Sequence, residues 1–159
     1  AQLIESFPED NLPIIASSMR FINLNQNTST IYISNEKAPQ KGYKSLDMGI
    51  IHPATLVPKS IYKQIGNYDD RFSIMADIDW FIRACKTHQP IYSSTIVSTN
   101  MCYGGISTTS QFKKLYKERT MLYKKHTRNL IEEKLYLSKW CIRHFKNTLY
   151  TKIKSLKHK

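Results

Sequence analysis

The sequence has no long hydrophobic run. Hydrophobic residues make up 41% of its 159 residues, but no stretch approaches the roughly 18 uncharged apolar residues of a membrane-spanning helix. The opening residues, AQLIE, have neither the basic segment nor the apolar run of a secretory signal. We therefore expect a cytoplasmic protein. With 11% aromatic residues, the chain can bury a core, which argues against disorder and fibrous repeats.

Cysteine is also scarce. The three cysteines, Cys85, Cys102 and Cys141, are odd in number, far apart and set among apolar neighbours. This pattern predicts reduced core thiols rather than disulfides or a zinc site. The sequence contains no internal repeat and no low-complexity tract.

Acidic residues are rare in the last third of the chain. Residues 1–110 contain nine Lys/Arg and nine Asp/Glu, whereas residues 111–159 contain fifteen Lys/Arg and three Asp/Glu, which accounts for the net charge of +12. We therefore expect a neutral globular domain over 1–110 and a basic tail over 111–159. Nucleic-acid binding is not expected, because no zinc spacing, Gly-rich RNA-binding signature or aromatic–basic platform accompanies the charge.

Several segments have the composition of β-strands. A hairpin is expected over 19–33, turning at Asn25-Gln26-Asn27. The run 48–57 is apolar and β-prone, but Pro53 cannot donate a ladder hydrogen bond, so this strand is expected to be irregular. The predicted strands cover residues 12–17, 19–33, 48–57 and 91–98.

Other segments have the residue pattern of α-helices. Ser60 can cap a short helix over 61–65 that Gly66 ends. Apolar residues at 78, 81, 82 and 85 predict an amphipathic helix that starts at Asp77 and runs to about Lys86. Two basic amphipathic helices are expected in the tail, the second with an apolar residue every seventh position: Leu135, Ile142, Leu149 and Leu156.

Four motifs succeed one another in the globular part. They are IHPATLVPK (51–59), IGNYDDRF (65–72), ADIDWFIR (76–83) and YGGIS (103–107). In this order they resemble motifs of bacterial family 2 (GT-A type) glycosyltransferases, namely His-x-Ala-Thr-Phe, Leu-Gly-x-Phe-Asp-Glu-x-Phe, Ala-Asp-x-Asp-(Leu/Trp) and Gly-Gly-(Ile/Val)-Ser. Each motif alone is weak, but four in order at suitable spacing are fairly specific. The similarity covers about residues 14–109.

The resemblance implies an α/β fold: the acceptor-side part of a Rossmann-like GT-A domain that lacks the N-terminal nucleotide-binding half. It implies transfer of a sugar from a nucleotide-sugar donor to a glycan or lipid-linked acceptor in cell-surface polysaccharide synthesis, with inversion. It also implies a divalent metal, Mn²⁺ or Mg²⁺, whose ligands belong mainly to the missing half. We therefore expect the chain to be a fragment, a truncated product or half of a split enzyme.

The resemblance makes Asp77 the catalytic base, which removes a proton from the acceptor hydroxyl. A helix N-terminus would favour its ionised form, although an ordinary N-cap explains an aspartate equally well without chemistry. Asp77-Ile78-Asp79 also spells the Asp-x-Asp metal motif of this fold, but it begins an amphipathic helix instead of ending a buried strand. Asp79 is expected to bind the acceptor or to stabilise the helix, and Trp80 to stack on a sugar or to pack in the core.

The remaining candidates also have a structural alternative. His52 is predicted to contact the acceptor or to be a hydrogen-bonded core residue of a strand. By the resemblance, Gly104, Gly105 and Ser107 lie beside the active site; otherwise they form a turn. Asp69 and Asp70 are expected to close the turn after Gly66.

The tail has two interpretations. Its helices, with Lys/Arg on one face and Leu, Ile, Trp140 and Phe145 on the other, can lie on the anionic inner face of a membrane. Alternatively they pack on the domain and leave a solvated basic face. A hypothesis of a different class therefore stands beside the transferase: a non-catalytic basic module that binds membrane or polyanion through 111–159.

Overall fold

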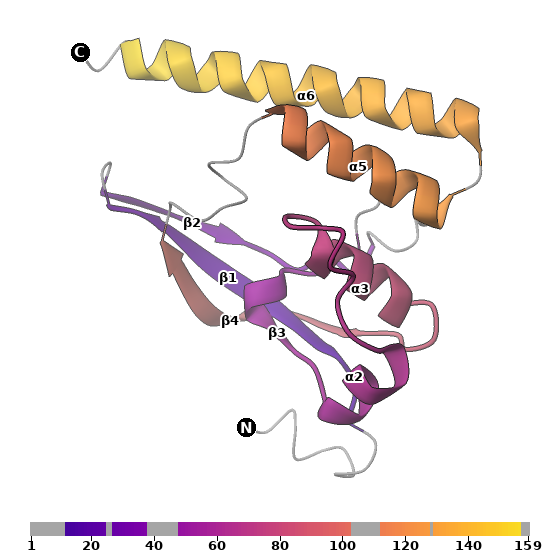
Figure 1. Ribbon diagram of the computed structural model, residues 1–159. Helices are drawn as coiled ribbons and strands as arrows, with labels where there is room; N and C mark the ends of the chain where they lie inside the picture. Colours follow the sequence, from indigo (N-terminus) through magenta and orange to yellow (C-terminus); the bar gives the residue numbers. More distant parts are fainter. Residues whose placement is uncertain (1–11, 25–26, 38–47, 103–111, 128, 157–159) are drawn as a thin grey trace.

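The structure is a computed structural model that describes residues 12–24, 27–37, 48–102, 112–127 and 129–156. These residues form a mixed α/β fold with one sheet and four α-helices. In Figure 1 the helices α5 and α6 lie together along one side of the molecule, with α5 between α6 and α3.

The sheet is organised around β1 (Ile15–Asn23). On one edge, β1 pairs antiparallel with β2 (Thr28–Tyr32) and, nearer its start, with β3 (Thr55–Leu56). On the other edge it pairs in parallel with β4 (Ile91–Cys102), with irregular register around Ser18. The sheet of the described residues is thus mixed, and the Rossmann-like parallel sheet expected from the resemblance does not appear in them.

The hairpin and the last strand are confirmed, but the predicted strand over 48–57 is largely wrong. Only Thr55–Leu56 are extended in the sheet, and His52–Ala54 form a 3₁₀ turn. Pro53 has no N–H to donate and its ring fixes φ, which favours such a turn. The Thr55 hydroxyl closes the turn by donating to the Ile51 carbonyl at 2.8 Å.

The two short helices begin close to their predicted positions. α2 (Lys59–Ile65) has Pro58 at its N-cap, so the predicted Ser60 cap is wrong. Gly66 ends α2 as predicted, with φ of +83°, a conformation that glycine adopts without steric cost. α3 (Ala76–Ala84) buries its apolar face, including Ile82.

The two tail helices are confirmed as α5 (Phe112–His126) and α6 (Leu130–Leu156). Helix α5 is part of the core: Leu122 and Tyr123 pack in one buried cluster with residues of the 1–110 region. The partners in that cluster are Met48, Phe72, Met75 and Ile82. No helix in the described parts of the chain is long and apolar enough to cross a membrane.

Cys85, Cys102 and Cys141 are thiols that form no disulfide with one another. Cys85 is half-buried, and burial raises the pKa of its thiol to about 12. Cys102 is exposed, so the prediction of a core position is wrong for this residue.

Glu118 of α5 attaches this helix to the segment that leads into α3. Its carboxylate accepts hydrogen bonds from the Ser73 hydroxyl at 2.6 Å and from the backbone N–H groups of Ser73, Ile74 and Met75 at 2.8–3.2 Å. Burial acts to raise the pKa of Glu118, but these donors outweigh it and the pKa lies below its usual value. The charged carboxylate therefore satisfies three backbone donors that precede α3.

Replacing Glu118 by alanine is expected to lower the free energy of unfolding by about 3 kcal/mol, because three N–H groups lose a charged acceptor. Urea unfolding monitored by circular dichroism would measure this. The neighbouring exposed Lys117 provides the control, and Lys117→Ala should change stability by less than about 0.5 kcal/mol. Equal effects of the two substitutions would contradict this role of Glu118.

Candidate functional site

Asp77 lies in the first turn of α3 with its side chain 35% exposed. Its Oδ1 accepts a hydrogen bond from the Ile78 N–H at 2.8 Å, and its Oδ2 lies 3.7 Å from Nδ1 of His52. Met75 occupies the N-cap position, so the interpretation of Asp77 as an ordinary N-cap is wrong. The structure thus brings together two of the predicted site residues at the positive end of a helix.

His52 begins the 3₁₀ turn, and two strands hold that turn in place. The Ser17 hydroxyl of β1 donates to the Ala54 carbonyl at 2.6 Å, and the Thr99 hydroxyl of β4 donates to the Pro53 carbonyl at 2.9 Å. The His52 side chain is 46% exposed. It therefore occupies neither a strand nor the core, and its ring is accessible beside Asp77.

Aromatic rings form one wall of this site. The His52 ring lies edge-on to the ring of Tyr68, with 6.4 Å between centroids, and to that of Phe81, with 5.7 Å. The Tyr68 hydroxyl is 3.1 Å from the Tyr62 hydroxyl. Burial, then the interaction with Tyr62, then the negative charge of Asp77 raise the pKa of Tyr68 well above its usual value. The phenol therefore stays protonated and can donate a hydrogen bond.

Tyr68 was not among the residues selected from the sequence. A signal was present, because Tyr68 stands in the 65–72 motif where the family pattern has phenylalanine. The extra hydroxyl adds a polar group to an otherwise apolar wall.

Asp79 lies in a different environment from Asp77. Its side chain is fully buried, and its Oδ1 accepts from His126 Nε2 at 2.8 Å and from Lys125 Nζ at 2.7 Å. Its Oδ2 accepts from Arg83 Nε at 3.0 Å. Burial acts to raise its pKa, but the bonds from His126, Lys125 and Arg83 outweigh it and lower the pKa to about 2. Of the two predicted roles of Asp79, these contacts support stabilisation of the helix.

The Asp-x-Asp sequence does not present two available carboxylates to one metal ion. Both oxygens of Asp79 accept from nitrogen donors of the protein, whereas Asp77 is partly exposed. Among the residues that the structure describes, no three His, Cys, Asp or Glu side chains gather as a metal site.

Trp80 is fully buried, so its ring does not face a sugar in this structure. Its indole N–H donates to the Gly66 carbonyl at 2.8 Å, and its ring lies 4.4 Å from that of Tyr62 and 5.3 Å from that of Phe81. Of the two interpretations of Trp80, packing in the core is the one observed. The ring supports the wall of the site from behind.

The remaining predicted residues are Asp69, in the turn after Gly66, and the residues of the 104–107 loop. Asp69 closes the turn as expected by accepting from the Arg71 N–H at 3.1 Å. It also binds the side chains of Arg71 and Lys125, which hold the pKa of Asp69 well below its usual range. Gly104, Gly105 and Ser107 lie outside the described residues.

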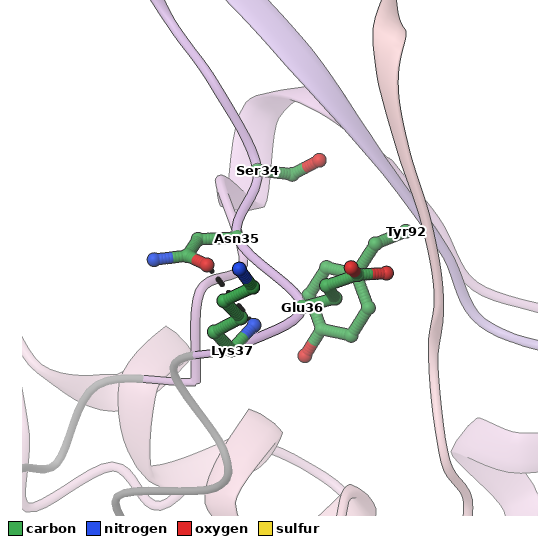
Figure 2. Close-up of a pocket in the computed structure, with 5 residues that line it drawn as sticks. All are labelled: Ser34, Asn35, Glu36, Lys37 and Tyr92. Carbon is green, nitrogen blue, oxygen red and sulfur yellow. Dashed lines mark hydrogen bonds between the residues drawn. The ribbon is translucent and has the colours of Figure 1, made fainter.

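A polar cavity of about 300 Å³ lies elsewhere on the molecule. Figure 2 shows its lining residues on the segment that follows β2, with Tyr92 of β4 opposite them. Tyr92 donates its hydroxyl proton to the Met48 carbonyl at 2.6 Å. None of the lining residues was predicted from the sequence; they are Ser34, Asn35, Glu36, Lys37 and Tyr92.

Comparison with known proteins gives no match: no protein-family model fits the chain, and no curated protein or solved structure is significantly similar to it. The resemblance to family 2 glycosyltransferases therefore rests on the four motifs alone.

The stability of the protein is expected to fall in acid because of Asp79. Its pKa is lowered from 3.8 to about 2 in the folded state, so the ionised carboxylate stabilises the fold at higher pH. That contribution, roughly 2 kcal/mol, is lost as the pH falls from about 4 to about 2. Urea unfolding at a series of pH values would measure the decline.

Asp79→Asn should flatten this part of the pH profile and destabilise the protein at neutral pH, because Arg83 loses its counter-ion and Lys125 keeps only Asp69. Asp70→Asn, at an exposed position of the preceding turn, is the control and should retain the wild-type profile. If Asp79→Asn leaves the acid dependence unchanged, the ionised Asp79 is not its source.

Proposed function

We propose that this chain supplies the acceptor side of a family 2, GT-A type glycosyltransferase, with Asp77 as the catalytic base. The proposal rests on the difference in burial and in hydrogen-bond partners between two neighbouring carboxylates. Asp79 is buried and held by three nitrogen-donor side chains, whereas Asp77 is partly exposed beside His52. Of these two carboxylates, only that of Asp77 is exposed to solvent, which supports its assignment as the group that an acceptor hydroxyl reaches.

In the proposed reaction, Oδ2 of Asp77 takes the proton of the acceptor hydroxyl while the hydroxyl oxygen attacks the anomeric carbon. The bond from that carbon to the nucleotide diphosphate breaks on the opposite face, which inverts the configuration. Oδ1 is held by the Ile78 N–H, so Oδ2 keeps its direction. His52 and the protonated Tyr68 lie beside it and can orient the acceptor through hydrogen bonds.

In the proposed enzyme, the nucleotide-sugar donor binds to a part other than this chain. We assign no segment of residues 1–159 to the nucleotide sugar, and the described residues offer no divalent-metal site. A metal ion bound with the donor would neutralise the diphosphate leaving group. The assay therefore requires a protein that contains both this chain and a nucleotide-sugar-binding half.

Asp77→Asn in such a protein is expected to reduce the rate of sugar transfer at least about a hundredfold, because an amide cannot accept the proton. Chromatographic detection of the glycosylated acceptor would measure the rate. Thermal unfolding should be little changed, since the asparagine side-chain oxygen can still accept from the Ile78 N–H.

Asp70→Asn is the matched control, because it makes the same chemical change on the exposed turn before α3. It should leave transfer unchanged. Full activity of the Asp77→Asn protein would remove Asp77 from the mechanism. Absence of transfer in the wild-type protein would favour the competing hypothesis of a non-catalytic basic module.

A further inference from the structure

The outer face of α6 carries large apolar side chains that are exposed. Ile131 is 79% exposed, Leu135 53%, Ile142 57% and Phe145 60%. Their spacing of four, seven and three residues places them in one stripe along a helix of 3.6 residues per turn. We refer to these four residues as the α6 stripe. Figure 1 shows α6 on the outside of the molecule, with α5 beneath it.

The opposite face of α6 packs against α5 and is a separate surface. Leu137 and Trp140 are buried there. The Trp140 ring stacks on Phe112 with 5.4 Å between centroids, and the Arg119 guanidinium lies 5.0 Å from the Trp140 centroid. Trp140 is therefore not part of the face available to a membrane. The sequence-based prediction that it belongs to that face is wrong. Phe145 also contacts α5, since its ring lies 5.2 Å from that of Phe112, yet it stays 60% exposed. Ile131, Leu135 and Ile142 are additional to the apolar surface that holds α6 in place.

Lysines border the α6 stripe on both sides. At about 100° per residue, Lys134 falls on one side of it and Lys139 and Lys146 on the other. All three are exposed. Two of the three acidic side chains of residues 111–159, Glu118 and Glu133, are buried. The third, Glu132, is partly exposed on the side of Lys139. The surface around the stripe is therefore apolar along its centre and has a net positive charge along its borders.

We propose that the α6 stripe docks on the surface of a membrane that contains anionic phospholipids. The apolar side chains would enter the headgroup–acyl boundary with the helix parallel to the surface, while the bordering lysines meet lipid phosphates. This proposal goes beyond sugar transfer and does not depend on it.

A second copy of the chain and a nucleic acid both fit the α6 stripe less well than anionic lipid. Two copies of the chain that paired through the stripe would bring Lys134, Lys139 and Lys146 of one copy against those of the other. A nucleic acid would satisfy the lysines but leave the four apolar side chains without an apolar partner. Anionic lipid offers both an apolar interior and negative headgroups.

The test is flotation of the whole chain with phosphatidylcholine vesicles that either contain or lack phosphatidylglycerol. The wild-type protein should bind only the anionic vesicles. Leu135→Ser with Ile142→Ser leaves the net charge unchanged and should weaken this binding at least about tenfold, because two apolar side chains no longer enter the lipid. Lys139→Gln with Lys146→Gln should weaken it about fivefold for each lysine removed.

Leu24→Ser is the matched control: it removes an apolar side chain that is 74% exposed, directly after β1 and not on α6. It should bind like the wild type. Circular dichroism should show unchanged helix content in every variant, because all the substituted side chains are exposed.

Three results would overturn the proposal. They are no binding to anionic vesicles, equal binding to both kinds of vesicle, and binding that the Leu135→Ser, Ile142→Ser protein retains in full. Sedimentation velocity would identify the second-copy alternative: a wild-type dimer that the double variant converts to monomer, without vesicle binding by either, would show that the α6 stripe joins two chains.

Discussion

Reciprocal carboxylate contacts between α3 and α5 hold the molecule together. Glu118 of α5 accepts the backbone donors that lead into α3, and Asp79 of α3 accepts Lys125 and His126 at the end of α5. Burying a carboxylate is costly unless several donors reach it, and each of these has at least three. Because the pairing is fixed at both ends, the start of α3 is fixed too, and with it the position of Asp77.

The helical repeat assigns different environments to the two aspartates of α3. Residues two apart on a helix point about 200° apart, so if Asp79 faces α5, Asp77 must face away from it. One carboxylate consequently serves the packing of α3 on α5, and the other lies at a surface beside His52 and Tyr68. The same motif thus supplies a structural residue and a chemically available one.

Local signals predicted much of the fold. The turn near Asn27, the end of α2 at Gly66 and the periodicity of α3 each depend on neighbouring residues. The irregularity at Pro53 was predicted, but the turn around His52 was not, because Ser17 and Thr99 also hold it from distant strands. The same holds for the site: the motif indicated Asp77 and His52, but the burial of Asp79 depends on residues of α5 outside the motif.

The order of contacts along the chain also has a consequence for synthesis. β1 obtains its longest partner only from Ile91–Cys102, and Asp79 obtains Lys125 and His126 only from the end of α5. A nascent chain that leaves the ribosome from its N-terminus thus displays β1 and α3 before their stabilising partners emerge. The sheet is therefore completed only when β4 is released, and the contacts of α3 only when α5 is released.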